Sequence, residues 1–218
     1  MDITGAIILA GGQGSRMGRP KQMLPIAGKA VLVRSIEAFC AVPSVNKIAV
    51  VTTEENFKEV SSLFPGLIHA LPGESRILSL QNGIKALGEA DLIAVHDGAR
   101  PLVNPEHIKA CLAAAKEYRA AVLCVPVKDT IKQVKDGFIE QTLERSVLWA
   151  AQTPQCYDGA TLRLALEKYG FLKDATDESQ LVEKLGVKVR VVPSGYENIK
   201  ITTPEDLIIA EALLCKHK

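Results

Sequence analysis

The chain has 218 residues, of which 47% are hydrophobic and 23% are charged. This profile is typical of a globular protein and excludes a disordered, collagen-like or disulfide-stapled chain. Lys and Arg total 26 against 25 Asp and Glu, so the formal net charge is only +1. No broad positive field is available to bind a nucleic-acid backbone, and we expect no nucleic-acid partner.

The five cysteines are odd in number, widely spaced and without a C-x-x-C pair, which argues against a disulfide framework or a zinc site. The first apolar run, residues 6–10, is far shorter than a signal-peptide core or a membrane span. These features predict a cytoplasmic protein with no membrane partner.

Short apolar, β-branched segments alternate with segments of helical periodicity along the chain. Residues 104–106 (Asn-Pro-Glu) and 203–206 (Thr-Pro-Glu-Asp) each predict a helix start, with a cap, an early proline and acidic residues. The strand–helix alternation predicts an α/β fold, a Rossmann-like, mostly parallel sheet flanked by helices, in one domain of residues 1–218. The predicted strands are residues 6–10, 47–52, 67–71, 91–96, 120–127 and 187–192.

One segment breaks this alternation. Residues 129–134 and 138–143 predict two strands joined by Lys135-Asp136-Gly137, because Asp-Gly is a strong signal for a tight hairpin turn. We expect a β-hairpin arm at about residues 128–147 that projects from the α/β body. A lone hairpin is marginally stable in water, which favours packing against a second copy of the chain. Packing against its own domain is the alternative.

A glycine-rich loop, GGQGSRMGRPKQ at residues 11–22, follows the first predicted strand. In parallel α/β folds ligands bind beyond the carboxyl ends of the strands, where glycine backbone can approach phosphates closely. Arg16, Arg19 and Lys21 would repel one another unless a highly charged anion such as a nucleoside triphosphate lay among them. A surface turn with solvated cations is the alternative.

Asp97 follows the predicted strand at residues 91–96, so we expect it at the same edge of the sheet as the glycine loop. Mg²⁺ binds few carboxylates together with phosphate oxygens and water, so Asp97 could hold a metal ion chelated by a triphosphate. The alternative is a turn former before Gly98. Lys200, just before the second predicted helix start, is either a further cation of the site or a solvated edge residue. We assign no chemistry to His96.

Five blocks resemble, in order, the 2-C-methyl-D-erythritol 4-phosphate cytidylyltransferases of isoprenoid synthesis, and the resemblance spans nearly the whole chain. They are residues 9–22, 96–101 (HDGARP), 127–130 (VKDT), 148–155 (LWAAQTPQ) and 198–207 (NIKITTPEDL). The glycine loop alone is shared with other nucleotidyltransferases, and this chain has Ala-Gly-Gly where the family often has Ala-Ala-Gly. The resemblance implies an Mg²⁺-dependent enzyme that joins CMP from CTP to the acceptor and releases pyrophosphate.

The resemblance also implies a role for individual residues of this sequence. The catalytic cations would be Arg16, Lys21 and Lys200, and Asp97 would bind the metal ion. CTP would contact residues of two loops, namely Ala10, Gly11, Gly12, Gly14, Gly73, Glu74 and Ser79. The acceptor would contact Arg100, Thr130, Arg145, Thr153 and Thr176. In the family, the matches of Thr130 and Arg145 reach the acceptor phosphate from the neighbouring subunit, which implies a homodimer.

Besides a Rossmann oxidoreductase, whose G-x-G-x-x-G fingerprint is missing from the glycine loop, two other functions stay open at this point. The first is the same chemistry on another polyol phosphate, such as ribitol 5-phosphate. The second is a non-catalytic nucleotide-binding module, because a fold does not determine a function. The presence of Arg16, Lys21, Asp97 and Lys200 argues against the second.

Overall fold

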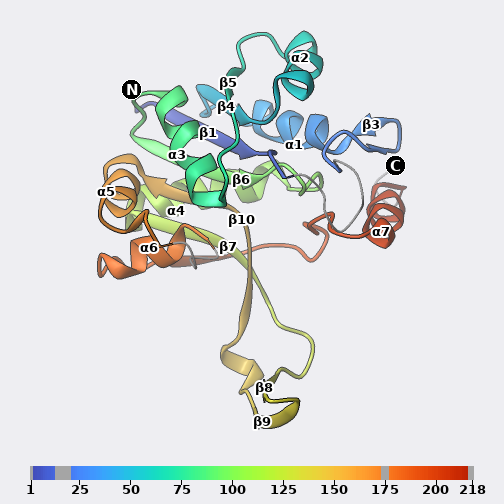
Figure 1. Ribbon diagram of the computed structural model, residues 1–218, viewed down its shortest axis with the longest axis vertical. Helices are drawn as coiled ribbons and strands as arrows, with labels where there is room; N and C mark the ends of the chain where they lie inside the picture. Colours follow the sequence, from blue (N-terminus) through green and yellow to red (C-terminus); the bar gives the residue numbers. More distant parts are fainter. Residues whose placement is uncertain (1, 13–20, 173–176, 216–218) are drawn as a thin grey trace.

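The computed structural model describes residues 2–12, 21–172 and 177–215. The strands of its main sheet are β1 (Thr4–Leu9), β4 (Lys47–Val51), β5 (Ile68–Ala70), β6 (Leu92–Asp97), β7 (Ala120–Pro126), β10 (Trp149–Asp158) and β11 (Arg190–Pro193). Over the described residues they form one seven-stranded sheet in the order β11-β7-β10-β6-β1-β4-β5, flanked by helices (Figure 1). This arrangement confirms the predicted α/β fold.

The sheet is mostly parallel, as predicted, except around β10. This strand lies between β6 and β7 and is antiparallel to both. The sequence analysis missed it because Gln152, Thr153, Pro154 and Gln155 interrupt its apolar character. The pairing with β7 shifts in register between Ala151 and Gln155, so the ladder is irregular where these polar residues lie. Pairing with a strand on each side holds β10 in the sheet.

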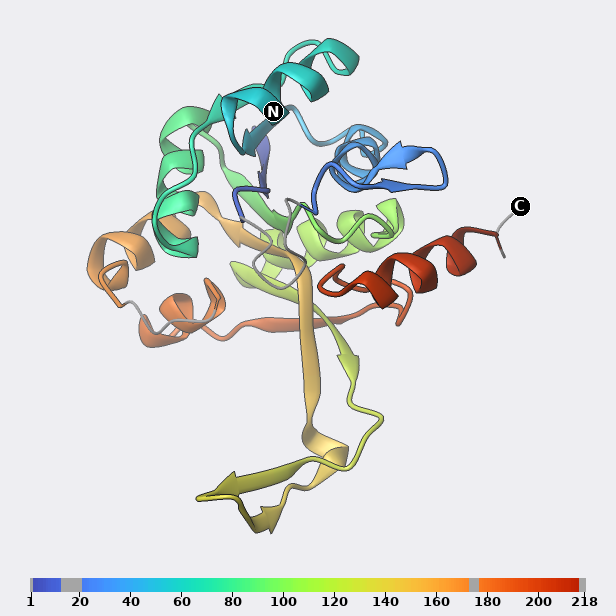
Figure 2. The ribbon, with the colours of Figure 1, turned by 45° about the vertical axis from the view of Figure 1, so that its right-hand side comes forward.

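Helices cover both faces of the sheet (Figure 2). Side chains of α1 and α4 pack with Ala6 and Ile8 of β1, whereas side chains of α3, α5 and α6 pack with Ile7 on the opposite face. The continuous apolar runs are therefore buried on both sides, as expected for parallel strands. The helices are α1 (Val31–Cys40), α2 (Glu54–Leu63), α3 (Arg76–Leu87), α4 (Pro105–Tyr118), α5 (Gly159–Tyr169), α6 (Ser179–Lys184) and α7 (Pro204–Cys215).

Both helix starts predicted from the sequence are confirmed. The Asn104 side chain accepts a hydrogen bond from the Glu106 N–H at 2.8 Å, and α4 begins at Pro105. The Asp206 carboxylate accepts from the N–H groups of Thr202 and Thr203 at 2.7 and 2.8 Å, which caps the start of α7. Among the described residues, no helix has both the length and the apolar character needed to cross a membrane.

Helix α7 packs away from the main sheet, against a small two-stranded sheet. Strands β2 (Pro25–Ile26) and β3 (Lys29–Ala30) form this sheet. Ile26 and Val31 form a buried cluster with Ile201 and Ala210, so the segment just before α7 is anchored to the body. This packing determines where Lys200, next to Ile201, lies.

The predicted hairpin is present. Strands β8 (Lys132–Lys135) and β9 (Phe138–Thr142) are antiparallel. Asp136 and Gly137 join them with φ of 51° and 84°, the left-handed conformation that an Asp-Gly turn requires. The hairpin lies away from the body, at the end of a stem formed by β10 and the chain after β7 (Figure 2).

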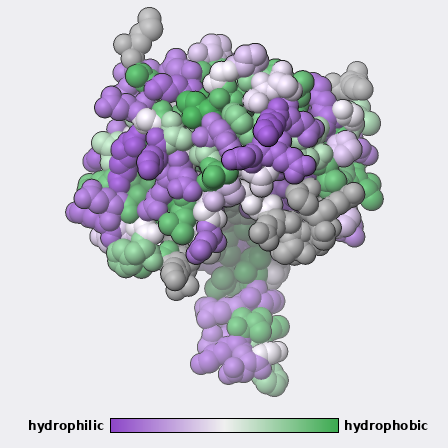
Figure 3. Space-filling model, turned by 45° about the horizontal axis from the view of Figure 1, so that its top comes forward, coloured by the Kyte–Doolittle hydropathy of each residue, from purple (hydrophilic) through white to green (hydrophobic). Residues whose placement is uncertain are grey.

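Every residue of β8 and β9 is exposed to solvent. Large apolar side chains are among them, since Phe138 is 79% exposed and Ile139 64%, and Val147, after the hairpin, is 69% exposed. Figure 3 shows this hydrophobic surface on the arm among hydrophilic residues. Within one chain the arm therefore has no hydrophobic core of its own.

Candidate active site

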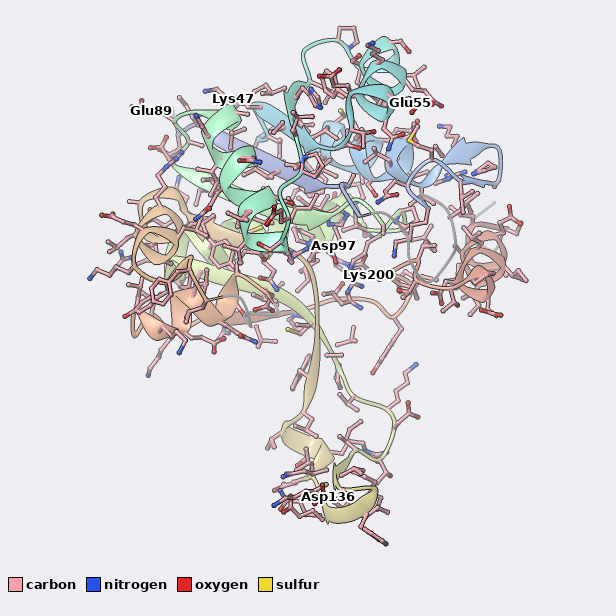
Figure 4. All side chains as sticks on the ribbon, in the orientation of Figure 1. Lys47, Glu55, Glu89, Asp97, Asp136 and Lys200 are labelled. Atoms are coloured by element: carbon pink, nitrogen blue, oxygen red, sulfur yellow. The ribbon has the colours of Figure 1, made fainter. Side chains whose placement is uncertain are left out.

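A cavity of about 620 Å³ lies beyond the carboxyl ends of β1 and β6. It is lined by the glycine loop, the loop before α3, the end of β6 and the segment before α7. In Figure 4 Asp97 and Lys200 lie near each other in the middle of the body. Eight of the residues predicted for the site line this cavity: Gly11, Gly12, Lys21, Gly73, Glu74, Ser79, Asp97 and Lys200.

The glycine loop is packed closely against the loop before α3. A Cβ atom on Gly11 would lie 2.2 Å from Pro72 Cβ, so only glycine fits at this position without a shift of the backbone. Gln22 holds the start of the loop, because its side-chain N–H donates to the Gly12 carbonyl at 2.6 Å. Ala10 is buried beneath this loop, and its N–H donates to the Val51 carbonyl at 2.8 Å.

Ser79 holds the loop before α3 in shape. Its hydroxyl accepts a hydrogen bond from the Gly73 N–H at 3.0 Å and donates to the Ser75 carbonyl at 2.9 Å. Ser75 in turn caps α3 by accepting from the Leu78 N–H at 3.1 Å. These hydrogen bonds hold the backbone N–H and C=O groups of the loop in place, which suits hydrogen bonding to the edge of a planar base. Contact of Ser79 with CTP itself stays a prediction.

Asp97 is the centre of a cluster of charges. Its Oδ1 pairs with Arg76, and its Oδ2 lies 2.7 Å from Lys200 Nζ. Arg100 Nε lies 3.9 Å from Oδ2. Burial by itself would raise the pKa of Asp97, but the neighbouring cations Arg76 and Lys200 hold this pKa well below its usual range. Asp97 is therefore a carboxylate at neutral pH and attracts cations.

Two buried side chains position Asp97 from behind. Its backbone N–H donates to Thr153 Oγ1 at 3.0 Å, and that hydroxyl also lies 3.0 Å from His96 Nδ1. His96 is fully buried, and burial lowers its pKa to about 3, so the imidazole is neutral. Its ring packs beside that of Phe39. Thr153 is also buried, so the structure places its hydroxyl under Asp97, and its contact with an acceptor stays a prediction.

Two residues that the sequence analysis did not assign complete the charge cluster. Arg76 lines the cavity, and its Nε lies 3.1 Å from Oε1 of Glu178. Its Nη2 donates to Oε2 of the same carboxylate at 3.3 Å. Glu178 is fully buried, although glutamate is almost never buried without a partner. Arg76 begins α3, just after Gly73 and Glu74, which were expected to contact CTP, whereas no signal in the sequence pointed to Glu178.

Asn198 is a third residue that was not assigned. It is fully buried, and its Nδ2 donates to Gln152 Oε1 at 2.9 Å and to the Thr153 carbonyl at 3.0 Å. Its own carbonyl accepts from Arg100 Nη1 at 2.7 Å. Asn198 therefore joins the segment that carries Lys200 to β10.

The described residues predicted to bind the acceptor fall into two groups, with Arg100 and Thr153 beside Asp97 and the other two on the arm. Thr130 and Arg145 lie on the arm, where Arg145 Nη1 donates to the Lys128 carbonyl at 2.7 Å. Figure 4 shows how far the tip of the arm, marked by Asp136, lies from Asp97. Among the other predicted site residues, Gly14, Arg16 and Thr176 lie outside the described residues.

The donor set around Asp97 suits a hard divalent metal ion. Over residues 2–12, 21–172 and 177–215, no group of three or more His, Cys, Asp or Glu could hold a metal ion. A single carboxylate on the wall of a cavity suits Mg²⁺, which takes its remaining ligands from phosphates and water. The residues thus fit a magnesium ion that is bound together with a triphosphate.

Comparisons with known proteins point to one family. The model of the 2-C-methyl-D-erythritol 4-phosphate cytidylyltransferase family matches residues 4–216. The enzyme of that name from Bacillus licheniformis is 42% identical over 223 residues, which cover 97% of this chain and 96% of that protein. The one from Pelotomaculum thermopropionicum is 44% identical over 237 residues, which cover 98% and 95%.

Solved structures lead to the same family. A 4-diphosphocytidyl-2C-methyl-D-erythritol synthase from Anaerococcus prevotii superposes with a TM-score of 0.88 at 31% identity, covering 98% of this chain and 96% of that one. The 2-C-methyl-D-erythritol 4-phosphate cytidylyltransferase of Francisella tularensis gives 0.82 at 31% identity, covering 96% and 99%. Since sequence and fold agree over almost the whole chain, the protein belongs to the 2-C-methyl-D-erythritol 4-phosphate cytidylyltransferase family.

Proposed function

We propose that the protein transfers CMP from CTP to 2-C-methyl-D-erythritol 4-phosphate, forming 4-diphosphocytidyl-2-C-methyl-D-erythritol and pyrophosphate in isoprenoid precursor synthesis. Membership of the family supports this assignment. The observation that carries it is the cavity, which is lined together by Gly11, Gly12, Lys21, Asp97 and Lys200. Such a cavity offers backbone and cations to a triphosphate at the edge of the sheet where ligands of α/β folds bind.

The reaction needs no nucleophile from the protein. An anionic oxygen of the acceptor phosphate attacks the α-phosphorus of CTP, the new P–O bond forms, and the bond to the β-phosphate oxygen breaks to release pyrophosphate. The protein must hold the two phosphates in line and meet the negative charge that develops on the α-phosphate. Lys21 and Lys200 line the cavity and serve this purpose. Arg16 is assigned to the same task by its position in the family motif.

A divalent ion completes the proposed site. Asp97 would hold Mg²⁺, which neutralises charge on the phosphates and makes pyrophosphate a better leaving group. The charged state of the Asp97 carboxylate, maintained by its neighbours, supports this assignment.

We propose that the acceptor half of the site is built by two chains. Thr130 and Arg145 are exposed on the arm and do not line the cavity of their own chain, and Phe138 and Ile139 leave apolar surface open beside them. A homodimer in which each arm reaches the partner's cavity would use both features. The planar guanidinium of Arg145 suits a phosphate because it donates two parallel hydrogen bonds.

The cysteines, all free thiols, fit the reducing cytoplasm that we propose as the location of the reaction.

The direct test is release of pyrophosphate by the purified protein with CTP, Mg²⁺ and a panel of polyol phosphates. We expect fast release only with 2-C-methyl-D-erythritol 4-phosphate, and its loss when the metal is chelated. Equal or faster release with ribitol 5-phosphate would transfer the assignment to that acceptor. No release with any acceptor would indicate a non-catalytic nucleotide-binding module.

A further inference from the structure

Arg76 bridges two carboxylates that lie on opposite sides of it. One is Asp97, which lines the cavity, and the other is Glu178, which is fully buried at the start of α6. The Arg76 side chain is 26% exposed, so the guanidinium lies at the wall of the cavity and is accessible from it.

Glu178 anchors this arginine. It binds Arg76 through both of its oxygens, at 3.1 and 3.3 Å. A buried carboxylate that loses its cation is strongly destabilising, so Arg76 must stay close to Glu178 whatever happens at Asp97. The guanidinium can therefore release Asp97 without leaving the cavity wall.

In this structure both carboxylate oxygens of Asp97 form ion pairs with cations. Arg76 pairs with Oδ1, and Lys200 lies 2.7 Å from Oδ2. These ion pairs, together with Arg100, join three cations to two carboxylates and leave one positive charge in excess. A bare divalent cation would be repelled by this excess, whereas a triphosphate reverses the local charge.

We infer that the Arg76 guanidinium occupies the position on the Asp97 carboxylate that a metal ion would take. When the metal ion and CTP bind together, the guanidinium moves from Asp97 to the phosphates. Glu178 holds the guanidinium at the cavity wall throughout this exchange. Arg76 is then a residue of the active site that binds either the carboxylate or the nucleotide. The inference rests on the proposed function, because it requires a metal ion at Asp97.

The test measures the affinity of the nucleotide-free protein for Mn²⁺, by titration with electron paramagnetic resonance of the free ion. Arg76→Gln should bind Mn²⁺ about tenfold more tightly than the unchanged protein, because the competing charged hydrogen bond to Asp97 is removed. The double variant Arg76→Gln/Glu178→Gln should show the same gain. It replaces the buried ion pair by two amides that can hydrogen-bond to each other, so it keeps the local net charge and guards against misfolding.

Lys85→Gln is the matched control. Lys85 is exposed on α3, the helix that Arg76 begins, and its substitution changes the total charge equally. The Mn²⁺ affinity of this variant should not change. A gain in Arg76→Gln that is absent from the double variant would show an effect of net charge alone, and the inference would be wrong. No gain in either variant would overturn it as well.

A second titration, of Mn²⁺ together with CTP, tests the other half of the exchange. Here both Arg76 variants should bind about tenfold more weakly, because a cation on the phosphates is lost. Asp97→Asn separates the two proposals. If it leaves Mn²⁺–CTP binding intact, the metal site at Asp97 is wrong and the inference fails with it. If it weakens that binding but the Arg76 variants match the unchanged protein, only the inference fails.

Discussion

The α/β body and the β-hairpin arm are stabilised in different ways. In the body, β1 and β6 are buried along nearly their whole length between helices on both faces of the sheet. In the arm, every residue of β8 and β9 is exposed. The body has a buried apolar core, whereas apolar side chains of the arm are exposed to solvent. These exposed apolar side chains are the reason for our proposal that the arm packs against a second surface.

The charges of the two regions differ in the same way. In the body, the cations around the cavity are held by carboxylates, Lys200 by Asp97 and Arg76 by Glu178. On the arm, Arg145 donates to the neutral carbonyl of Lys128, and no carboxylate within the described part of the chain pairs with it. The body thus presents a preorganised site for a triphosphate, and the arm presents a guanidinium still open to an anion.

The largest effect is expected in the body. Lys21→Ala should lower turnover by about 10²–10³, with a much smaller change in CTP affinity, because a cation aimed at developing charge stabilises the transition state more than the ground state. Steady-state kinetics and equilibrium binding of CTP measure the two quantities. Lys29→Ala is the control, since Lys29 is an exposed residue of β3 that pairs with Glu37. Unchanged turnover in Lys21→Ala would mean that Lys21 has no part in the transfer step.

A smaller effect is expected when the base of the nucleotide is changed. The wall of backbone groups held by Ser79 should prefer CTP to UTP, because a keto oxygen in place of the 4-amino group leaves acceptors unpaired. Each unpaired buried group costs about 1–3 kcal/mol, or about 5- to 150-fold in kcat/KM. Ser79→Ala should reduce this ratio by loosening the loop. Equal use of both nucleotides would contradict the assignment as a cytidylyltransferase, but it would not contradict nucleotidyl transfer itself.

The sequence was sufficient to predict the elements of the body whose structure is locally encoded. Apolar runs located six strands of the sheet, the capped segments located the starts of α4 and α7, and Asp136-Gly137 located the turn of the arm. Strand β10 was missed because polar residues at its centre hide it, and its place depends on the two strands beside it. A pattern within one segment carries no information on such a tertiary effect.

The same distinction applies to the site. Asp97 and Lys200 were found because each lies at a place in the chain where α/β folds bind ligands, and because the motifs around them resemble a family. Arg76 and Glu178 are 102 residues apart in sequence. Nothing local indicates that Glu178 is buried or that Arg76 is its partner, so their role could be read only from the folded chain.

A test of shared sites compares the two regions directly. Lys21→Ala and Arg145→Ala, each inactive alone, would be denatured together in equal amounts and refolded. If the arm completes the partner's cavity, about half of the dimers are mixed and one of their two sites is whole, so roughly a quarter of the original activity returns. Refolding each variant by itself is the control. If no activity returns in the mixture, each chain uses its own Arg145 and the arm lies back on its own body.

The smallest effect is expected from an apolar truncation on the arm. Ile139 is 64% exposed, whereas Ile36 of α1 is fully buried in the body. Ile36→Ala should lower the free energy of unfolding by about 2–5 kcal/mol, because it leaves a cavity in the core. Ile139→Ala should change it by less than about 0.5 kcal/mol at protein concentrations where the chain is monomeric, as for other surface substitutions. Denaturant unfolding at several protein concentrations measures both.

As the concentration rises, Ile139→Ala should begin to destabilise the chain, because dimerisation stabilises the folded state by mass action and the truncated arm dimerises more weakly. A large loss at every concentration would mean that Ile139 packs within its own chain, and the contrast between body and arm would not hold.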